Sequence, residues 1–371
     1  MMTGARKRAD TIVVEAGRIA HVGEKPRPSP GALEVDGTGK YLIPGLWDMH
    51  THHQMTGVES LGLYVANGVV GTRDMGSDAD FILPLRERIR RGETFGPVIV
   101  AAGPILDAAP PGWPYRRRVE TPEQGREAVR KLKGGGVDFI KVHDHTGREA
   151  FFAIADESAR LGLPFAGHVP ARVSVDETAA AGMKSIEHLA NSRVYLECAG
   201  TPSGYSLARC RSLFQRLAAR GVWQSPTLAF YQALPSLLSG ESPAHVEYAS
   251  DGFLAFTRAN TRASSLSPEA ISALRELARV NLNATRDLLK TGSRFLAGCD
   301  GLVPGFCLHD ELEWMVRAGF TPLQALRTAT PKPRRVPRAR CNHRHDRCRQ
   351  AGGPRAAGRR PPRRHQQHPP H

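Results

Sequence analysis

Two histidines separated by one residue, His50 and His52, stand at the end of the apolar run Ile43–His53. The run enters from a Pro-Gly turn, which predicts a buried strand whose last residues leave the sheet. Because strand side chains alternate between two faces, His50 and His52 point the same way and Thr51 points away. Two imidazoles on one side of a strand end are able to bind one metal ion. An isolated His-x-His pair is equally typical of ordinary polar residues at a strand terminus. The prediction of a metal site therefore depends on further ligands elsewhere in the chain.

Further polar residues follow apolar segments in the same way, each at the end of a predicted strand. They are Lys141, His168, His188 and Asp300. A single histidine in this position, such as His168, is more often a structural hydrogen-bonding group. Four histidines and an aspartate at the ends of strands in one fold make a metal site the better interpretation. Imidazole and carboxylate ligands favour Zn²⁺, and they also accept Mn²⁺ or Co²⁺.

Apolar strands that alternate with amphipathic helices position these residues. Eight strands are predicted, at Ile43–His52, Val69–Asp74, Pro97–Ala102, Asp138–His143, Pro164–His168, Lys184–His188, Val222–Thr227 and Arg294–Asp300. Helices are predicted at Ala79–Arg91, Pro122–Lys133, Arg148–Leu161 and Ser267–Lys290. This alternation predicts an α/β fold, a (β/α)₈ TIM-type barrel with its active site at the carboxyl ends of the strands. The long connection Leu228–Leu266 is expected to form a helical excursion over the barrel mouth.

The predicted barrel, residues 43–330, lies between two segments of different character. Residues 1–42 contain a predicted hairpin, Thr11–Glu15 with Arg18–Val22, and a third strand at Ala32–Val35, all of which belong to a small separate sheet. Residues 331–371 contain twelve arginines, one lysine and one aspartate, so this tail carries +12 of the net charge of +15. The tail has one valine and no larger apolar residue, and we expect it to be disordered.

Composition excludes several classes of protein. A chain of 371 residues with 40% hydrophobic content is long enough for a large barrel with a real core. There is no run of about 20 apolar residues to span a membrane, and residues 1–10 lack the apolar core of a signal peptide. The sequence as written therefore predicts a cytoplasmic protein, unless its N-terminus is truncated. None of the six cysteines shows Cys-x-x-Cys spacing, and we expect unpaired thiols at Cys198, Cys210, Cys299, Cys307, Cys341 and Cys348.

Several motifs carry a resemblance to a known family. They are PGLWDMHTH, GVVGTRD, VDFIKV, LPFAGHVP, KSIEHL, AGCDG and LHDELEWMVRAGFTPLQALRTAT, and together they span roughly residues 11–330. The chain resembles the amidohydrolase superfamily, specifically its imidazolonepropionase-like and Xaa-Pro dipeptidase-like branch. The resemblance implies a metal-bearing barrel with a small β-sandwich built from both chain ends, which is incomplete here. One departure is Cys299, which precedes Asp300 where relatives usually have a small hydroxyl residue.

The resemblance also implies a role for each residue at the strand ends. His50 and His52 would bind the more buried of two divalent metal ions, and His168 and His188 the more exposed one. Asp300 would contact the first ion and act in turn as general base and general acid.

Lys141 stands where binuclear relatives carry a carbamylated lysine that bridges both ions. A buried ammonium group is unable to ligate a metal, whereas capture of CO₂ turns it into an anionic oxygen ligand. An ion pair of Lys141 with Asp138 or Asp144 is the alternative.

Three residues near the predicted mouth are candidates for substrate binding: Arg73, His143 and His309. The guanidinium of Arg73 is able to hold a substrate carboxylate through two parallel hydrogen bonds. It is equally able to pair with its neighbour Asp74.

These observations predict a metal-dependent amidohydrolase that cleaves a C–N bond in a small amide, dipeptide or cyclic amide with a metal-activated hydroxide. The alternatives are a one-metal hydrolase of the imidazolonepropionase or deaminase kind, and a truncated product with impaired catalysis.

An arginine-rich tail that binds nucleic acid is a weaker hypothesis, since the first 330 residues are nearly neutral. We favour the hypothesis that residues 331–371 come from a frameshift, because their composition is what GC-rich DNA yields out of frame. The oligomeric state is left open.

Overall fold

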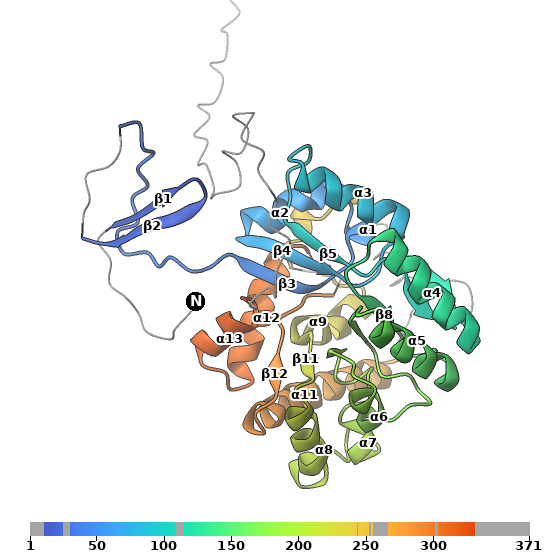
Figure 1. Cartoon of the computed structure of the whole chain (residues 1–371). Helices are drawn as coiled ribbons and strands as arrows, with labels where there is room; N and C mark the ends of the chain where they lie inside the picture. The colour runs from blue at the N-terminus through green and yellow to red at the C-terminus, as the bar shows by residue number, and fades with distance from the viewer. Residues whose placement is uncertain are drawn as a thin grey trace, which may run out of the picture. The chain divides into compact units, whose positions relative to one another are not determined.

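The computed structural model describes residues 11–24, 30–108, 115–242, 244–251, 254, 266–300 and 303–330. Of these, the residues up to 41 belong to one compact unit and those from 42 onward to another, and each is described by itself (Figure 1). The predicted basic tail, residues 331–371, lies outside the described residues.

The larger unit is built on parallel strands that alternate with helices along the chain. Its strands are β3 (Leu46–Thr51), β4 (Val69–Asp74), β5 (Val98–Ala101), β6 (Ile105–Asp107), β7 (Arg116–Arg118), β8 (Ile140–Val142), β9 (Phe165–Gly167), β10 (Ser185–Glu187), β11 (Trp223–Ser225) and β12 (Arg294–Phe295). Every predicted barrel strand is present, most of them shorter than expected. β6 and β7 were not predicted.

Hydrogen bonds join two sheets into one ring. One sheet contains β3, β4 and β5, and the other runs in the order β12-β11-β10-β9-β8-β6-β7. β5 and β6 are two halves of one barrel strand, since β5 pairs with β4 and β6 pairs with β8. On the far side, the N–H of Met49 donates to the Ala297 carbonyl at 2.9 Å and joins β3 to the segment after β12. The fold is therefore the predicted (β/α)₈ TIM-type barrel, with β7 added beside β6.

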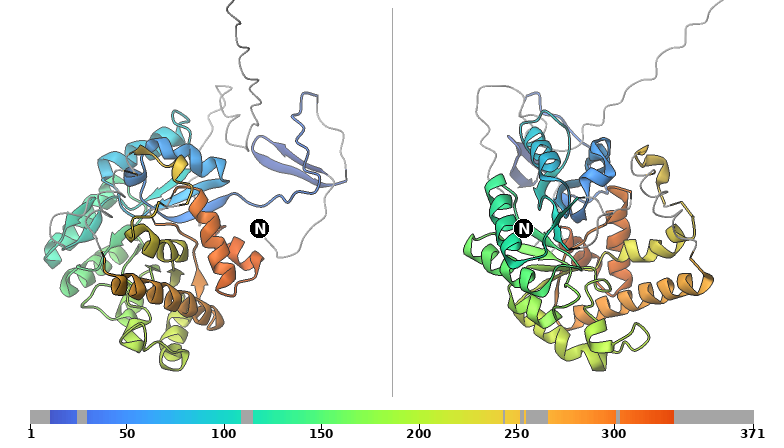
Figure 2. Two further views of the ribbon diagram at one scale, coloured as in Figure 1. Left: turned by 180° about the vertical axis from the view of Figure 1, so that it is seen from behind. Right: turned by 90° about the vertical axis from the view of Figure 1, so that its right-hand side faces the viewer.

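Most helices of this unit lie outside the strands (Figures 1 and 2). The helices of the unit are α1 (His53–Thr56), α2 (Leu61–Ala66), α3 (Ala79–Arg90), α4 (Pro122–Gly135), α5 (Arg148–Arg160), α6 (Val175–Ala180), α7 (Leu196–Ala199), α8 (Leu207–Arg220), α9 (Leu228–Leu238), α11 (Pro268–Lys290), α12 (Phe306–Arg317) and α13 (Pro322–Thr328), with 3₁₀ turns at Val58–Ser60 and Val246–Tyr248. The start of α4 follows from its sequence, because Thr121 and Gln124 form a capping box and Pro122 fits the first turn. Within the described residues, no helix combines the length and the hydrophobicity that a membrane span requires.

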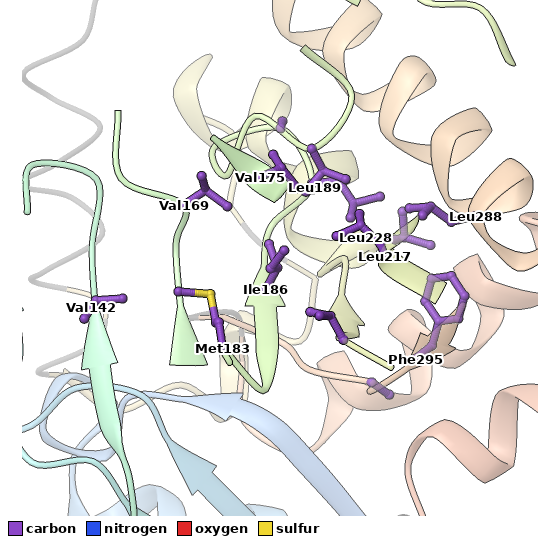
Figure 3. Close-up of a cluster of buried hydrophobic side chains, with 14 of the residues drawn as sticks. Val142, Val169, Val175, Met183, Ile186, Leu189, Leu217, Leu228, Leu288 and Phe295 are labelled. Atoms are coloured by element: carbon purple, nitrogen blue, oxygen red, sulfur yellow. The ribbon is translucent and has the colours of Figure 1, made fainter. Parts of the chain in front are cut away.

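The main core lies between the strands and the helices outside them (Figure 3). Ile186 of β10 and Val142 of β8 are completely buried, as are Leu217 of α8 and Leu288 of α11. Burial of such side chains contributes about 1.5–3 kcal/mol each. This packing fixes the strand ends that carry the polar residues of the site.

The smaller unit contains an antiparallel hairpin, β1 (Thr11–Glu15) and β2 (Arg18–Gly23). Both strands agree with the prediction. The third strand expected at Ala32–Val35 is wrong, because residues 32–37 have no regular structure. Val14 and Ile19 are more than half exposed, so the hairpin buries little apolar surface of its own.

The prediction of unpaired thiols is wrong for four cysteines. Disulfides join Cys198 to Cys210 and Cys299 to Cys307. The first connects α7 with α8, and the second connects the segment after β12 with α12. Sequence spacing gave no sign of either pair, because folding rather than a local motif brings the partners together. Cys341 and Cys348 lie outside the described residues.

Candidate active site

The four predicted histidines are all held through Nδ1 by an acceptor of the protein. The contacts are His50 to Glu187 (3.1 Å), His52 to the Gly76 carbonyl (3.0 Å), His168 to Asp144 (2.8 Å) and His188 to the Thr227 hydroxyl (2.6 Å). The Thr227 hydroxyl donates its own proton to the Pro226 carbonyl and therefore accepts from His188. A neutral imidazole carries one N–H, so a donating Nδ1 leaves a lone pair on Nε2. Histidines that bind metals are oriented in this way.

Three of these Nε2 atoms surround the carboxylate of Asp300. His50 and His52 each lie 3.4 Å from Oδ1, and His188 lies 3.2 Å from Oδ2. Where an imidazole is neutral, its Nε2 lone pair faces a lone pair on oxygen, which is repulsive unless a proton or a cation lies between them. At His52 burial lowers the pKa of the imidazole, whereas a hydrogen bond to Asp300 raises it. The donor set of nitrogen and oxygen atoms fits a divalent metal ion.

Asp300 is ionised in this setting. Burial raises the pKa of the carboxyl group, but positive charge on His50 and His188 and a hydrogen bond from His52 lower it well below its usual range. The side chain is nevertheless partly exposed, so a small molecule is able to reach it.

Lys141 lies at the middle of β8 and is almost completely buried. It forms no ion pair in the described part of the chain. Asp138 pairs with Arg86 at 2.6 Å instead, and Asp144 pairs with His168, so neither takes the partner role considered for Lys141. Burial lowers the pKa of Lys141 to about 8.

Left-handed backbone conformations close three strand ends, at His188 (φ 59°), Thr227 (φ 47°) and Asp300 (φ 59°). Such conformations are uncommon for residues other than glycine. The left-handed conformation of His188 changes the direction of its side chain. Glu187 and His188 are consecutive in the sequence, yet both side chains are buried inside the barrel. A regular strand would send one of the two outward.

The strand end that carries His50 is bonded directly to the segment that carries Asp300. The N–H of Asp300 donates to the His50 carbonyl at 2.9 Å. The buried carboxylate of Asp48 accepts the N–H groups of His50 and Cys299 through its Oδ1 atom, both at 3.1 Å. Gly298 permits this approach, since a Cβ atom there would lie 2.6 Å from the His50 Cβ atom.

A family profile decides the identity of the fold. The profile of the amidohydrolase family matches residues 41–336. The chain belongs to the amidohydrolase family.

Curated relatives match over short segments. A segment of 62 residues is 40% identical to the dihydroorotase of Trichlorobacter lovleyi and covers 17% of this chain and 14% of that protein. Another comparison gives 45% identity over 49 residues with the 5'-deoxyadenosine deaminase of Methanothermobacter thermautotrophicus, which is 13% of this chain and 12% of that protein. The matches thus span less than a sixth of either relative.

Solved amidohydrolase structures match most of the chain. Bottromycin amidohydrolase has a TM-score of 0.63 at 23% identity, over 85% of this chain and 70% of that one. A Xaa-Pro dipeptidase with bound methionine has a TM-score of 0.59 at 17% identity, over 86% and 81%. The ochratoxinase of A. niger has a TM-score of 0.57 at 20% identity, over 77% and 70%. These likenesses agree with the barrel fold.

In this amidohydrolase, Arg73 has neither of the two roles considered for it. Its guanidinium is buried, where it donates to both carboxylate oxygens of Glu187 at 2.8 and 2.9 Å and to the Ser185 hydroxyl. Asp74 instead accepts the N–H of His53. Arg73 therefore supports the strand ends from inside the barrel, and we withdraw it from the substrate contacts.

The other two predicted substrate residues differ in position. The ring of His143 stacks on that of His168, with 3.9 Å between centroids, and so lies beside a candidate metal ligand. His309 is exposed on α12, and its Nε2 contacts the Asn67 carbonyl at 3.0 Å. Its ring has no contact with the four histidines, so we withdraw His309 from the site as well.

Sequence reasoning missed the residues that hold the imidazoles, above all Glu187, Asp144 and Thr227. Each of them lies within one residue of a strand end or of a predicted ligand, which was the available signal. It also missed Tyr231 of α9, whose ring centroid lies 6.1 Å from that of His188. The Tyr231 hydroxyl is buried, and the backbone of Asn191 provides a hydrogen bond to it.

Proposed function

We propose that this chain is a metal-dependent amidohydrolase that hydrolyses a C–N bond in a small amide, dipeptide or cyclic amide. The observation that carries the proposal is the convergence of three Nε2 atoms on the Asp300 carboxylate. The Xaa-Pro dipeptidase and the bottromycin amidohydrolase share this fold, which supports the C–N bond as the target.

The residues present fit two divalent ions, with Zn²⁺ the best match and Mn²⁺ or Co²⁺ acceptable. His50, His52 and Asp300 would hold one ion, and His168 and His188 would hold the other. Bound there, the metal supplies Lewis acidity, which lowers the pKa of water and polarises a carbonyl group.

Asp300 moves the proton in this proposal. Its carboxylate is ionised and lies at the mouth, so it accepts a proton from the attacking water and then delivers it to the leaving nitrogen. The buried hydroxyl of Tyr231, whose ring lies beside that of His188, is the best-placed further donor to the substrate. His143, beside His168, is the second substrate contact that we retain.

As a carbamate, Lys141 would supply an anionic oxygen ligand for both ions. Its neutral amine adds to CO₂ and releases one proton, which leaves an anionic oxygen ligand. The lowered pKa of the buried amine favours this addition, and the absence of an ion pair in the described residues leaves Nζ available.

A screen of N-acyl amino acids and Xaa-Pro dipeptides, with metal-loaded protein and an Asp300→Asn control, tests the activity. Hydrolysis that is lost in Asp300→Asn and after chelation supports the proposal. If the loaded protein is inactive toward the whole panel, amide hydrolysis is contradicted.

The alternative is a one-metal hydrolase of the imidazolonepropionase or deaminase kind, which the curated match to a deaminase favours. In such an enzyme, loss of Lys141 would leave metal content unchanged.

A further inference from the structure

The disulfide between Cys299 and Cys307 lies directly beside the candidate ligand Asp300. Cys299 precedes Asp300, and Cys307 lies in the first turn of α12. Both cysteines are buried. The bond therefore ties the backbone next to Asp300 covalently to the start of a helix.

Asp300 depends on its surroundings for its conformation. Its φ of 59° is left-handed, and residues other than glycine keep such a conformation only where neighbouring contacts impose it. Two backbone hydrogen bonds contribute, from Asp300 N–H to the His50 carbonyl and from Cys299 N–H to Asp48. The disulfide adds a covalent constraint to these two bonds.

The carboxylate of Asp48 lies close enough to the disulfide to accept a hydrogen bond from a cysteine after reduction. An oxygen of Asp48 and the two sulfurs all lie within 4.8 Å of one another, and all three residues are buried. Asp48 Oδ2 has no hydrogen-bond partner among the described residues. After reduction, a thiol S–H of Cys299 or Cys307 is able to donate to the Asp48 carboxylate. Asp48 and the two cysteines are therefore able to form hydrogen bonds in the reduced state as well.

A small molecule has a route to the disulfide. Cys307 helps to line a cavity of about 220 Å³ between α9 and α12, together with Ala229, His245 and Trp314. Thiol–disulfide exchange depends on access of this kind. A dithiol in the cavity attacks Sγ of Cys307 through one thiolate and forms a mixed disulfide, while Cys299 leaves as a thiolate and takes up a proton. The second thiol then releases Cys307, so that the dithiol ends as a disulfide after giving two electrons and two protons.

We propose that the Cys299–Cys307 disulfide is a redox-sensitive lock on Asp300. In the oxidised protein the lock holds Asp300 in its metal-binding conformation, and reduction by a small dithiol loosens Asp300 and weakens metal binding. This proposal rests on the metal site proposed above.

The test compares oxidised protein with protein that has been reduced with dithiothreitol and then desalted. The affinity of metal-free protein for Mn²⁺ is measured, because Mn²⁺ prefers oxygen and nitrogen ligands and does not report on new thiolates. Hydrogen exchange of the peptide covering residues 299–308 is measured in parallel. Reduction is expected to weaken Mn²⁺ binding about tenfold, as loss of an outer-shell support does in other metal sites, and to speed exchange of this peptide.

The second disulfide provides the matched control. The Cys198→Ser/Cys210→Ser protein is expected to respond to reduction as the wild type does. The Cys299→Ser/Cys307→Ser protein is expected to bind Mn²⁺ weakly from the start and to show no response. If that variant does not fold, the wild type and the control variant still decide the matter.

Equal Mn²⁺ affinity and equal exchange in the oxidised and reduced wild type would overturn the lock. If no metal binds in either state but exchange still rises on reduction, the lock stands and the proposed metal site fails.

Discussion

Nδ1 of His50 donates to Oε2 of Glu187 at 3.1 Å, and Glu187 in turn pairs with the guanidinium of Arg73 at 2.8 Å. All three side chains are buried. Burial opposes ionisation of Glu187, but Arg73 and His50 hold its pKa well below the usual range. One carboxylate therefore orients a candidate metal ligand and neutralises a buried cation.

Substitution Glu187→Gln tests this double role. We expect affinity for Mn²⁺ to fall about 10- to 100-fold, because the imidazole of His50 loses its anionic acceptor. We also expect the free energy of unfolding to fall by about 3 kcal/mol, because Arg73 loses its partner in the interior. Metal titration and urea denaturation measure the two effects. Glu276→Gln, which removes an exposed carboxylate paired with Arg279, serves as the control and should change neither value. Unchanged metal affinity in Glu187→Gln would contradict the assigned role.

Lys141→Met tests the bridging ligand. The substitution keeps an unbranched side chain of similar length in a buried position but removes the amine. We expect the metal content to fall from two ions per chain to one, with a large loss of hydrolysis. Lys131→Met, at an exposed position on α4, should retain both ions. If Lys141→Met also retains two ions, Lys141 is a bystander.

Asp300→Asn tests whether the metal-free site is repulsive. An amide N–H would donate to a histidine Nε2, whereas the carboxylate repels each facing Nε2 atom that carries a lone pair. We therefore expect the metal-free variant to melt at or above the temperature of the metal-free wild type. Added metal should raise the melting temperature of the wild type, by mass action, and leave the variant unchanged. A variant that is stabilised by metal as strongly as the wild type would argue against Asp300 as a ligand.

Glu311 should make stability depend on pH. It is buried on α12, where Oε2 accepts the N–H of Ala229 at 2.8 Å and Oε1 has no partner among the described residues. Burial raises its pKa from 4.5 to about 8. Between these two values the folded state keeps a proton that the unfolded state has released, so this group's contribution to stability falls as the pH rises through that window.

The measurement is denaturation of wild type and Glu311→Gln at several pH values. The variant should gain stability relative to wild type as the pH rises from 5 to 8.5, since glutamine stays neutral. Glu313→Gln, at an exposed position on the same helix, is the control and should show no such trend. Parallel curves for wild type and Glu311→Gln would show that Glu311 does not titrate as proposed.

Much of the fold was predictable from the sequence because it depends on local patterns. The alternation of apolar strands and amphipathic helices from β3 onward predicted the barrel, and the amphipathic pattern predicted that α4 begins at Pro122. The division of one strand into β5 and β6 was missed, because short buried strands carry little periodicity of their own.

The candidate ligands were predictable because they lie within or shortly after apolar strand segments, whereas their partners were not. Arg73 reaches Glu187 across the barrel, 114 residues further along the chain, and no local pattern reports such a contact. The left-handed conformation of His188, which turns Glu187 and His188 to the same side, also has no signature in the residue types. The prediction of a third strand at Ala32–Val35 was wrong although the local pattern was apolar. A strand needs a partner, and this segment has none among the described residues.

The number of metal ions per chain tests the central claim most directly. Purified protein is loaded with Zn²⁺, desalted and analysed for metal and protein by elemental analysis, alongside a His168→Ala/His188→Ala variant. The account predicts two ions in the wild type and one in the variant. One ion or none in the wild type, or two in the variant, would contradict it.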